Sequence, residues 1–227
     1  MSRESQHTSR AWWPLFGLAA VAFGHTATWM AQFALSPDEL RVGGQVMFDA
    51  YNDDGTELLF RLSAGMGMLG IAALVVFGAG FRRMLEQRVP RESLLPAVAG
   101  NALIATAGAL LVAFVFRAMV FDTIAEYGVE TQVTTYSLSQ NVPLAAWVGV
   151  GVAEVVTAVA AFKYGAFGKG FGWFSAVLAA LTLIVVLTGT PFPGNVAAGI
   201  WLIGAAVVAM RGATVANRAP ALTPVTA

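Results

Sequence analysis

The chain has 227 residues, of which 57% are hydrophobic and only 11% are charged. Together with a mean hydropathy of +0.70, this composition excludes an ordinary soluble domain and predicts a multi-pass membrane protein. The 13 basic and 13 acidic residues cancel, so no overall charge favours nucleic acid as a partner, and the lack of cysteine excludes disulfides, thiolate metal sites and a cysteine nucleophile.

Six apolar segments alternate with polar ones, and each predicts a membrane-spanning helix. The first opens with Trp12 and Trp13, residues typical of a membrane boundary. It is about twice as long as the apolar region of a secretory signal, so we expect it to be retained. The second should begin at the capping box that starts with Asp54. We predict one all-α membrane domain over 1–227, with polar tails at 1–10 and 212–227 and spans at 12–35, 58–81, 95–119, 143–162, 171–188 and 195–210.

The distribution of basic residues predicts the orientation of these spans. If the N-terminus is cytoplasmic, the three bases on the outer side are Arg41, Arg61 and Arg117, and the other ten of the 13 lie inside. Cytoplasmic segments of membrane proteins carry such an excess of Lys and Arg. We therefore expect both termini in the cytoplasm, in a cytoplasmic membrane of prokaryotic type, with membrane lipids as partners.

A shared spacing suggests an inverted repeat of three spans plus three. In the first and fourth spans an ionisable residue stands eleven positions after a proline, and a threonine follows three positions later: Pro14, His25 and Thr28 against Pro143, Glu154 and Thr157. An odd number of spans per half would invert the halves relative to each other, as in many secondary transporters. Coincidence among small and apolar residues is the alternative explanation.

Glu154 is the strongest candidate for a functional residue. It lies near the middle of the fourth apolar segment, where a charge costs about 2.5–3.5 kcal/mol on insertion scales. We expect it to face the bundle interior, either protonated or beside a partner. The hypothesis is a proton- or cation-binding pocket at mid-depth, and the alternative is a structural hydrogen bond between helices. The candidate ligand-binding residues are Glu154, His25, Thr28, Gln32, Asn101 and Thr157.

Several other chemistries find no support in the sequence. His25 is the one histidine within a predicted span, so a pair of haem ligands is missing. The acidic run before Glu57 does not match a calcium loop, and no hydrolase or zinc-protease motif occurs. We therefore predict no catalytic residues, no metal and no cofactor. Arg61 and Arg117 are expected at the outer boundary, anchored to head-groups or paired with Glu57 and Asp122.

The segment Leu59-Phe60-Arg61-Leu62 follows an acidic, threonine-containing loop, and its apolar helix closes in Phe81-Arg82-Arg83-Met84-Leu85. In these features the chain resembles a prokaryotic family of six-helix membrane proteins of unknown function. The resemblance extends over residues 12–210 in layout, with its residue-level support in the second helix. It implies a compact six-helix bundle and no particular activity.

Three function classes follow from these observations. The first is a membrane protein that binds or transports a small molecule or ion around Glu154 and His25. The second is a non-catalytic accessory or assembly subunit that contacts a protein partner or a second copy through small-residue helix faces. An intramembrane enzyme comes third, because no paired nucleophile and base is present.

Overall fold

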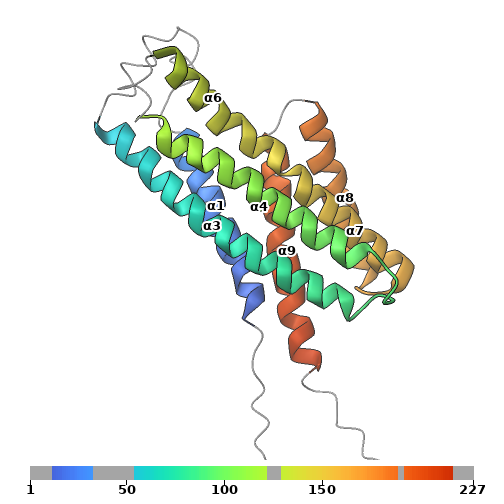
Figure 1. Ribbon diagram of the computed structural model, residues 1–227. Coiled ribbons are helices and arrows are strands. Elements are labelled where there is room, and N and C mark those ends of the chain that lie inside the picture. Colours follow the sequence, from blue (N-terminus) through green and yellow to red (C-terminus); the bar gives the residue numbers. More distant parts are fainter. Residues whose placement is uncertain (1–11, 33–53, 122–128, 189–191, 217–227) are drawn as a thin grey trace, which may run out of the picture.

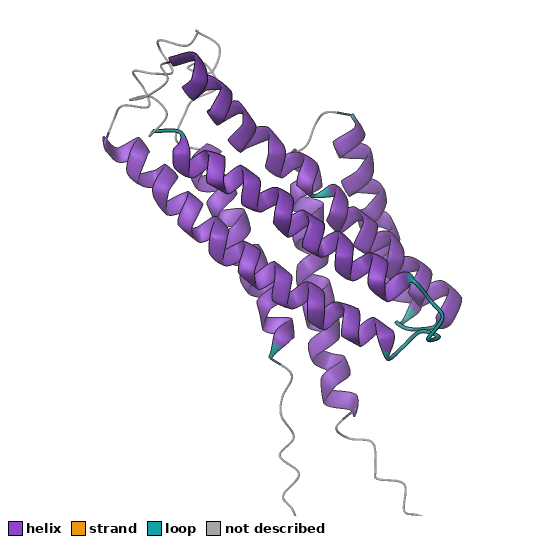
Figure 2. Cartoon of the chain, viewed as in Figure 1, coloured by secondary structure: helices purple, strands orange, loops and turns teal. Residues whose placement is uncertain are grey.

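The computed structural model describes residues 12–32, 54–121, 129–188 and 192–216. All regular secondary structure in these ranges is helical, as Figure 2 shows, which confirms the predicted fold class. The helices are α1 (Trp13–Gln32), α3 (Asp54–Glu86), α4 (Leu95–Met119), α6 (Val129–Ala146), α7 (Val148–Tyr164), α8 (Lys169–Leu187) and α9 (Phe192–Ala216).

The helices form a closed ring. Each packs against its neighbour in sequence, α4 contacts both α6 and α7, and α9 returns to α1. α6 and α7 follow one another in the same direction, and the other helices that are neighbours in sequence run antiparallel, so α1 begins and α9 ends at the same end of the ring (Figure 1). Aromatic side chains fill part of the core, where Phe81 meets Trp201 edge to face at 5.5 Å between ring centroids.

Close approach of backbones holds α1 against α3. A Cβ atom placed on Gly70 would lie 2.8 Å from the backbone nitrogen of Gly24, so a side chain at position 70 would push the helices apart. Small residues at such contacts are typical of helix pairs in membranes, where dispersion forces replace the hydrophobic effect as the source of attraction.

The predicted fourth span is longer than expected and is interrupted. The polar stretch before it is helical from Val129, and its hydroxyl groups donate to the backbone of their own helix, as Thr134 does to the Glu130 oxygen at 2.9 Å. Such bonds allow a polar sequence to remain helical without further partners. The interruption lies at Trp147, between α6 and α7, four residues after Pro143.

Four helices are long and apolar enough to cross a membrane: Gly55–Glu86, Leu95–Met119, Glu130–Tyr164 and Gly194–Arg211. The described apolar stretch of α8, Lys169–Ile184, is shorter. By length and composition these helices indicate a membrane protein. The count of six spans and the inverted repeat go beyond this finding and stay predictions.

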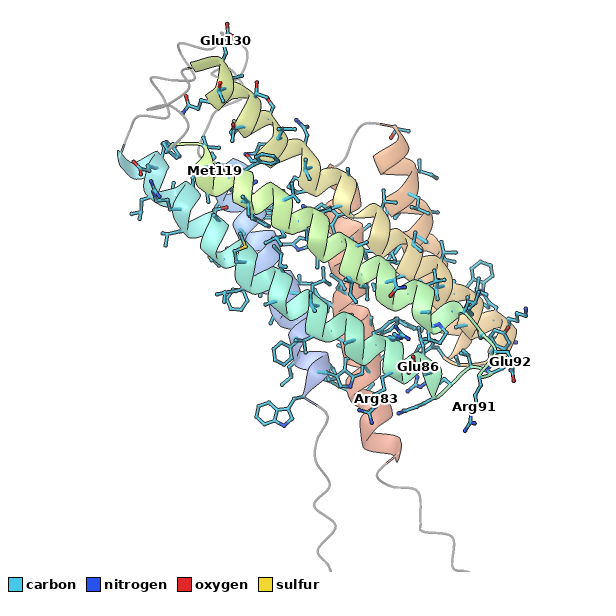
Figure 3. The ribbon with its side chains drawn as sticks, viewed as in Figure 1. Arg83, Glu86, Arg91, Glu92, Met119 and Glu130 are labelled. Carbon is cyan, nitrogen blue, oxygen red and sulfur yellow. The ribbon has the colours of Figure 1, made fainter. Side chains whose placement is uncertain are left out.

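Charged side chains gather at the two ends of the ring. Figure 3 shows Arg83 and Arg91 at one end and Glu130 at the other. We call the first the basic end, because the described basic residues on its helix ends and connections are Arg82, Arg83, Arg88, Arg91, Lys163, Lys169 and Arg211. The described charges near the opposite end, apart from the buried Arg117, are Glu57, Arg61 and Glu130.

Candidate functional site

Glu154 lies inside the bundle, as its position in the apolar segment predicts. Its side chain is 0% exposed, and neither carboxyl oxygen has a hydrogen-bond partner among the described residues. The hydroxyl of Thr182 on α8 lies beside the carboxyl group, but the two do not meet the geometry of a hydrogen bond. A fully buried carboxylate without compensation is too costly to persist, so this group must carry a proton or bind a cation.

Small residues bring α7 and α8 together around Glu154. A Cβ atom on Gly151 would lie 2.8 Å from Cδ2 of Leu183, and one on Gly172 would lie 2.9 Å from the Cβ of Ala161. Between the helices, Gly165 adopts a left-handed conformation with φ of 64°, which reverses the chain at no steric cost. Glu154 therefore sits in the seam of a tight helical hairpin.

His25 occupies a separate position, where α1 meets α9 and the junction of α6 and α7. Its Nε2 atom lies 3.0 Å from the backbone oxygen of Asn195, and its ring centroid lies 5.2 Å from that of Trp147. None of the contacts found among the described residues joins His25 to Glu154. Trp147 precedes Glu154 by seven residues, which corresponds to about 10 Å along a helix.

The other predicted site residues are dispersed. Thr28 and Thr157 are buried, and each donates its hydroxyl to its own helix, Thr28 to the Gly24 oxygen at 2.9 Å and Thr157 to the Ala153 oxygen at 2.8 Å. Asn101 is exposed on α4 and so lines no interior site. The side chain of Gln32 is outside the described part of the structure.

Arg117 is a buried charge whose burial the sequence analysis did not predict. Anchoring to head-groups was one expectation, yet its side chain is 0% exposed within the bundle, and the other expected partner, Asp122, lies outside the described residues. Nη1 donates to the Ala27 oxygen and to Ser63 Oγ, both at 3.0 Å, and Nη2 donates to the Ser139 oxygen at 3.1 Å. The pairing expected for Arg61 is confirmed, because its Nε atom donates to Glu57 Oε1 at 2.7 Å.

Two features of the sequence indicate the contact between Arg117 and the Ser139 carbonyl. Proline has no N–H group, so Pro143 cannot donate to the carbonyl of Ser139, four residues earlier. A carbonyl left without its helical partner inside a membrane must find a donor on another helix. Arg117 is the basic residue nearest the end of the adjacent apolar segment, and its guanidinium supplies that donor.

A small apolar cavity of about 10 Å³ lies among α1, α3, α4, the α6–α7 junction and α9. Its walls include Gly24, Gly67, Gly70, Phe114 and Trp147. This volume is close to the minimum of about 10–15 Å³ that holds one water molecule, so the cavity does not accommodate a larger substrate.

Comparison of the chain with protein-family models, with curated proteins and with solved structures found no match in any of the three. Within the described ranges, no group of three or more His, Cys, Asp or Glu side chains could hold a metal ion.

Proposed function

We propose that the chain is a six-span protein of a cytoplasmic membrane, with both termini in the cytoplasm, that binds a proton or small cation reversibly at Glu154 and acts in transport. The observation that carries the proposal is the complete burial of Glu154 without a hydrogen-bond partner among the described residues. Ionisable groups of this kind inside membrane proteins commonly mark ion pathways and proton relays.

The surfaces of α1 and α8 support six spans rather than four. Large apolar side chains are exposed on α8 at Trp173, Val177, Leu181 and Ile184, and on α1 at Leu15, Phe16, Phe23 and Trp29. The candidate spans α3 and α4 expose large apolar side chains in the same way. Water would not favour such surfaces, whereas lipid tails would. The ring therefore fits a bilayer best with all of its helices inserted.

The proposed orientation rests on the basic end, because an excess of Lys and Arg marks the cytoplasmic side. The ring order is also compatible with a 3+3 inverted repeat, since it sets the first and fourth spans on opposite sides. That repeat would relate His25 to Glu154, although each has its own neighbours in the structure.

Flux into proteoliposomes tests the proposal. Purified protein is reconstituted into vesicles that contain a pH-sensitive dye, and proton movement is followed after a step in external pH, with sodium or potassium gradients as further arms. We expect flux above that of empty vesicles for the natural protein and for Glu130→Gln, an exposed control. Glu154→Gln should reduce flux to the level of empty vesicles. Equal flux from Glu154→Gln, or no flux from the natural protein, would contradict the proposal.

A second function is favoured by the outward face of α4. Asn101, Ala105 and Gly108 are exposed there, one or two turns apart, and small residues beside a polar amide favour close contact with another transmembrane helix. An accessory or assembly subunit would use this face. Asn101→Leu should then reduce chemical cross-linking to a second copy or to a co-purifying membrane protein, while thermal stability stays unchanged; unaltered cross-linking would exclude this role for Asn101.

A further inference from the structure

His25 and two polar side chains beside it leave hydrogen-bonding atoms buried without a described partner. They are the indole N–H of Trp147, both carboxamide atoms of Asn195 and Nδ1 of His25 itself. Trp147 is 3% exposed and Asn195 is 1% exposed, so lipid and bulk water do not reach them. The three residues come from the α6–α7 junction, α9 and α1, which are distant in sequence.

Contacts with His25 bring these three residues together. The imidazole packs against the Trp147 ring, and its Nε2 atom reaches the Asn195 backbone oxygen at 3.0 Å. A Cβ atom on Gly199 would lie 2.5 Å from Nε2, so glycine is what lets the ring lie against the backbone of α9. If Nε2 carries the donated proton, Nδ1 of the neutral ring is an acceptor.

The cluster thus offers both donors and acceptors to a small molecule. The donors are the Trp147 indole and the Asn195 amide nitrogen, and the acceptors are His25 Nδ1 and the Asn195 amide oxygen. Leaving a buried polar group unpaired is destabilising, and in folded proteins bound water commonly removes that cost. Trp147 also lines the neighbouring apolar cavity of about 10 Å³, whose walls include neither His25 nor Asn195.

We propose that His25, Trp147 and Asn195 form a hydrated site within the bundle, in which water bridges their unpaired groups. Asn195 lies in the first turn of α9, at the end of the ring opposite the basic end, and Trp147 precedes Glu154 by two helical turns. The hydrated site therefore lies between that end and Glu154. Its role as a route by which a proton or cation reaches Glu154 rests on the proposed function, whereas its hydration does not.

Hydrogen exchange in D₂O tests the hydration directly on the natural protein. The indole N–H signals are followed by NMR on protein labelled at tryptophan, and Trp147 is identified by the signal that Trp147→Phe loses. Trp201 is the internal control, because it is 0% exposed and its indole donates to Ser175 Oγ at 3.0 Å. We expect Trp147 to exchange much faster than Trp201. Exchange as slow as that of Trp201 would overturn the hydrated site.

The variant Asn195→Leu gives a second, independent readout. Leucine has nearly the shape of asparagine but cannot hold water, so a hydrated site predicts a lower Tm. If the site were dry, the same change would remove an unpaired amide and raise the Tm, which would also overturn the inference. Asn141→Leu is the matched control, since Asn141 is exposed and bonds only to its own helix among the described residues.

The flux experiment separates this inference from the proposed function. Fast exchange at Trp147 together with full flux from Glu154→Gln would leave the hydrated site standing and remove the role of Glu154. Loss of flux in Glu154→Gln together with slow exchange at Trp147 would support the role of Glu154 and overturn the hydrated site. If Trp147 exchanges fast and Glu154→Gln loses flux, Asn195→Leu should slow the flux without abolishing it, because the route is narrowed while Glu154 is intact. Unchanged flux in Asn195→Leu would show that the hydrated site is not a route to Glu154.

Discussion

Nη2 of Arg117 donates a hydrogen bond of 3.1 Å to the backbone oxygen of Ser139, the carbonyl that Pro143 leaves without its helical donor. The other terminal nitrogen of the same guanidinium reaches Ala27 on α1 and Ser63 on α3. One side chain of α4 therefore joins three other helices. The fork of donors on arginine suits this task, since lysine presents a single nitrogen.

Replacing Arg117 should destabilise the protein severely. In Arg117→Gln the shorter side chain cannot reach all of these oxygens, and each buried oxygen left without its donor costs about 1–3 kcal/mol. Thermal or chemical unfolding in detergent measures the change. Arg61→Gln is the control, because its exposed pair with Glu57 is worth about 0–1 kcal/mol. Equal losses in the two variants would contradict the buried role of Arg117.

The link between Arg117 and Pro143 should appear in a double-mutant cycle. Pro143→Ala restores an N–H that can donate to the Ser139 oxygen, so this carbonyl no longer depends on Arg117. We expect Pro143→Ala to stabilise the Arg117→Gln protein more than the natural one, by about 1–3 kcal/mol, the cost of an unpaired buried carbonyl. Additive unfolding free energies would show that the two residues act independently.

The sequence predicts the helical class, the start of α3 at Asp54 and the burial of Glu154, because the length of an apolar segment, a capping box and the cost of a lipid-facing charge are local signals. It does not predict the contacts of Arg117, since its acceptors are two backbone oxygens and a serine hydroxyl on three other helices. Nor does it predict the contact between Trp147 and His25. Those contacts depend on which helices are neighbours in the ring, and residue spacing along one helix carries no such information.

Two glycines with opposite surroundings test the packing of α4 against α7. A Cβ atom on Gly149 would collide with Thr106 Oγ1 and the backbone oxygen of Ala102, so Gly149→Ala must force the helices apart. The same change also threatens the bond of 3.1 Å from Thr106 to the Ala146 oxygen at the α6–α7 break. We expect a loss of about 1–3 kcal/mol, typical of overpacking.

Gly108→Ala is the control for Gly149→Ala. Nothing lies within 4 Å of the added atom at this exposed position of α4, and alanine favours a helix over glycine by about 0.5–1 kcal/mol. Its Tm should therefore stay the same or rise. A similar fall in Tm for both variants would mean that the cost comes from replacing glycine in a helix rather than from the contact with α4.

Arg88 joins the two connections at the basic end. Its Nη1 atom donates to the Ala166 oxygen at 3.2 Å, and its guanidinium lies 5.0 Å from the centre of the Phe167 ring. Partial burial lowers the pKa of Arg88 below its ordinary value, but a guanidinium keeps its proton at any pH that the fold survives. The contact should therefore be insensitive to pH and sensitive to substitution.

Arg88→Gln removes the cation over Phe167, an interaction worth on the order of 1 kcal/mol, and the bond to Ala166. Since both act on the connection between α7 and α8, we expect faster amide exchange at residues 165–169 and only a small fall in Tm. Hydrogen exchange measured by mass spectrometry reports this, with the exposed Arg91→Gln as control. Arg91 has no described contact with that connection. The same rise in exchange in Arg91→Gln would therefore mean that the loss of positive charge at the basic end, rather than the loss of the Arg88 contacts, causes the faster exchange.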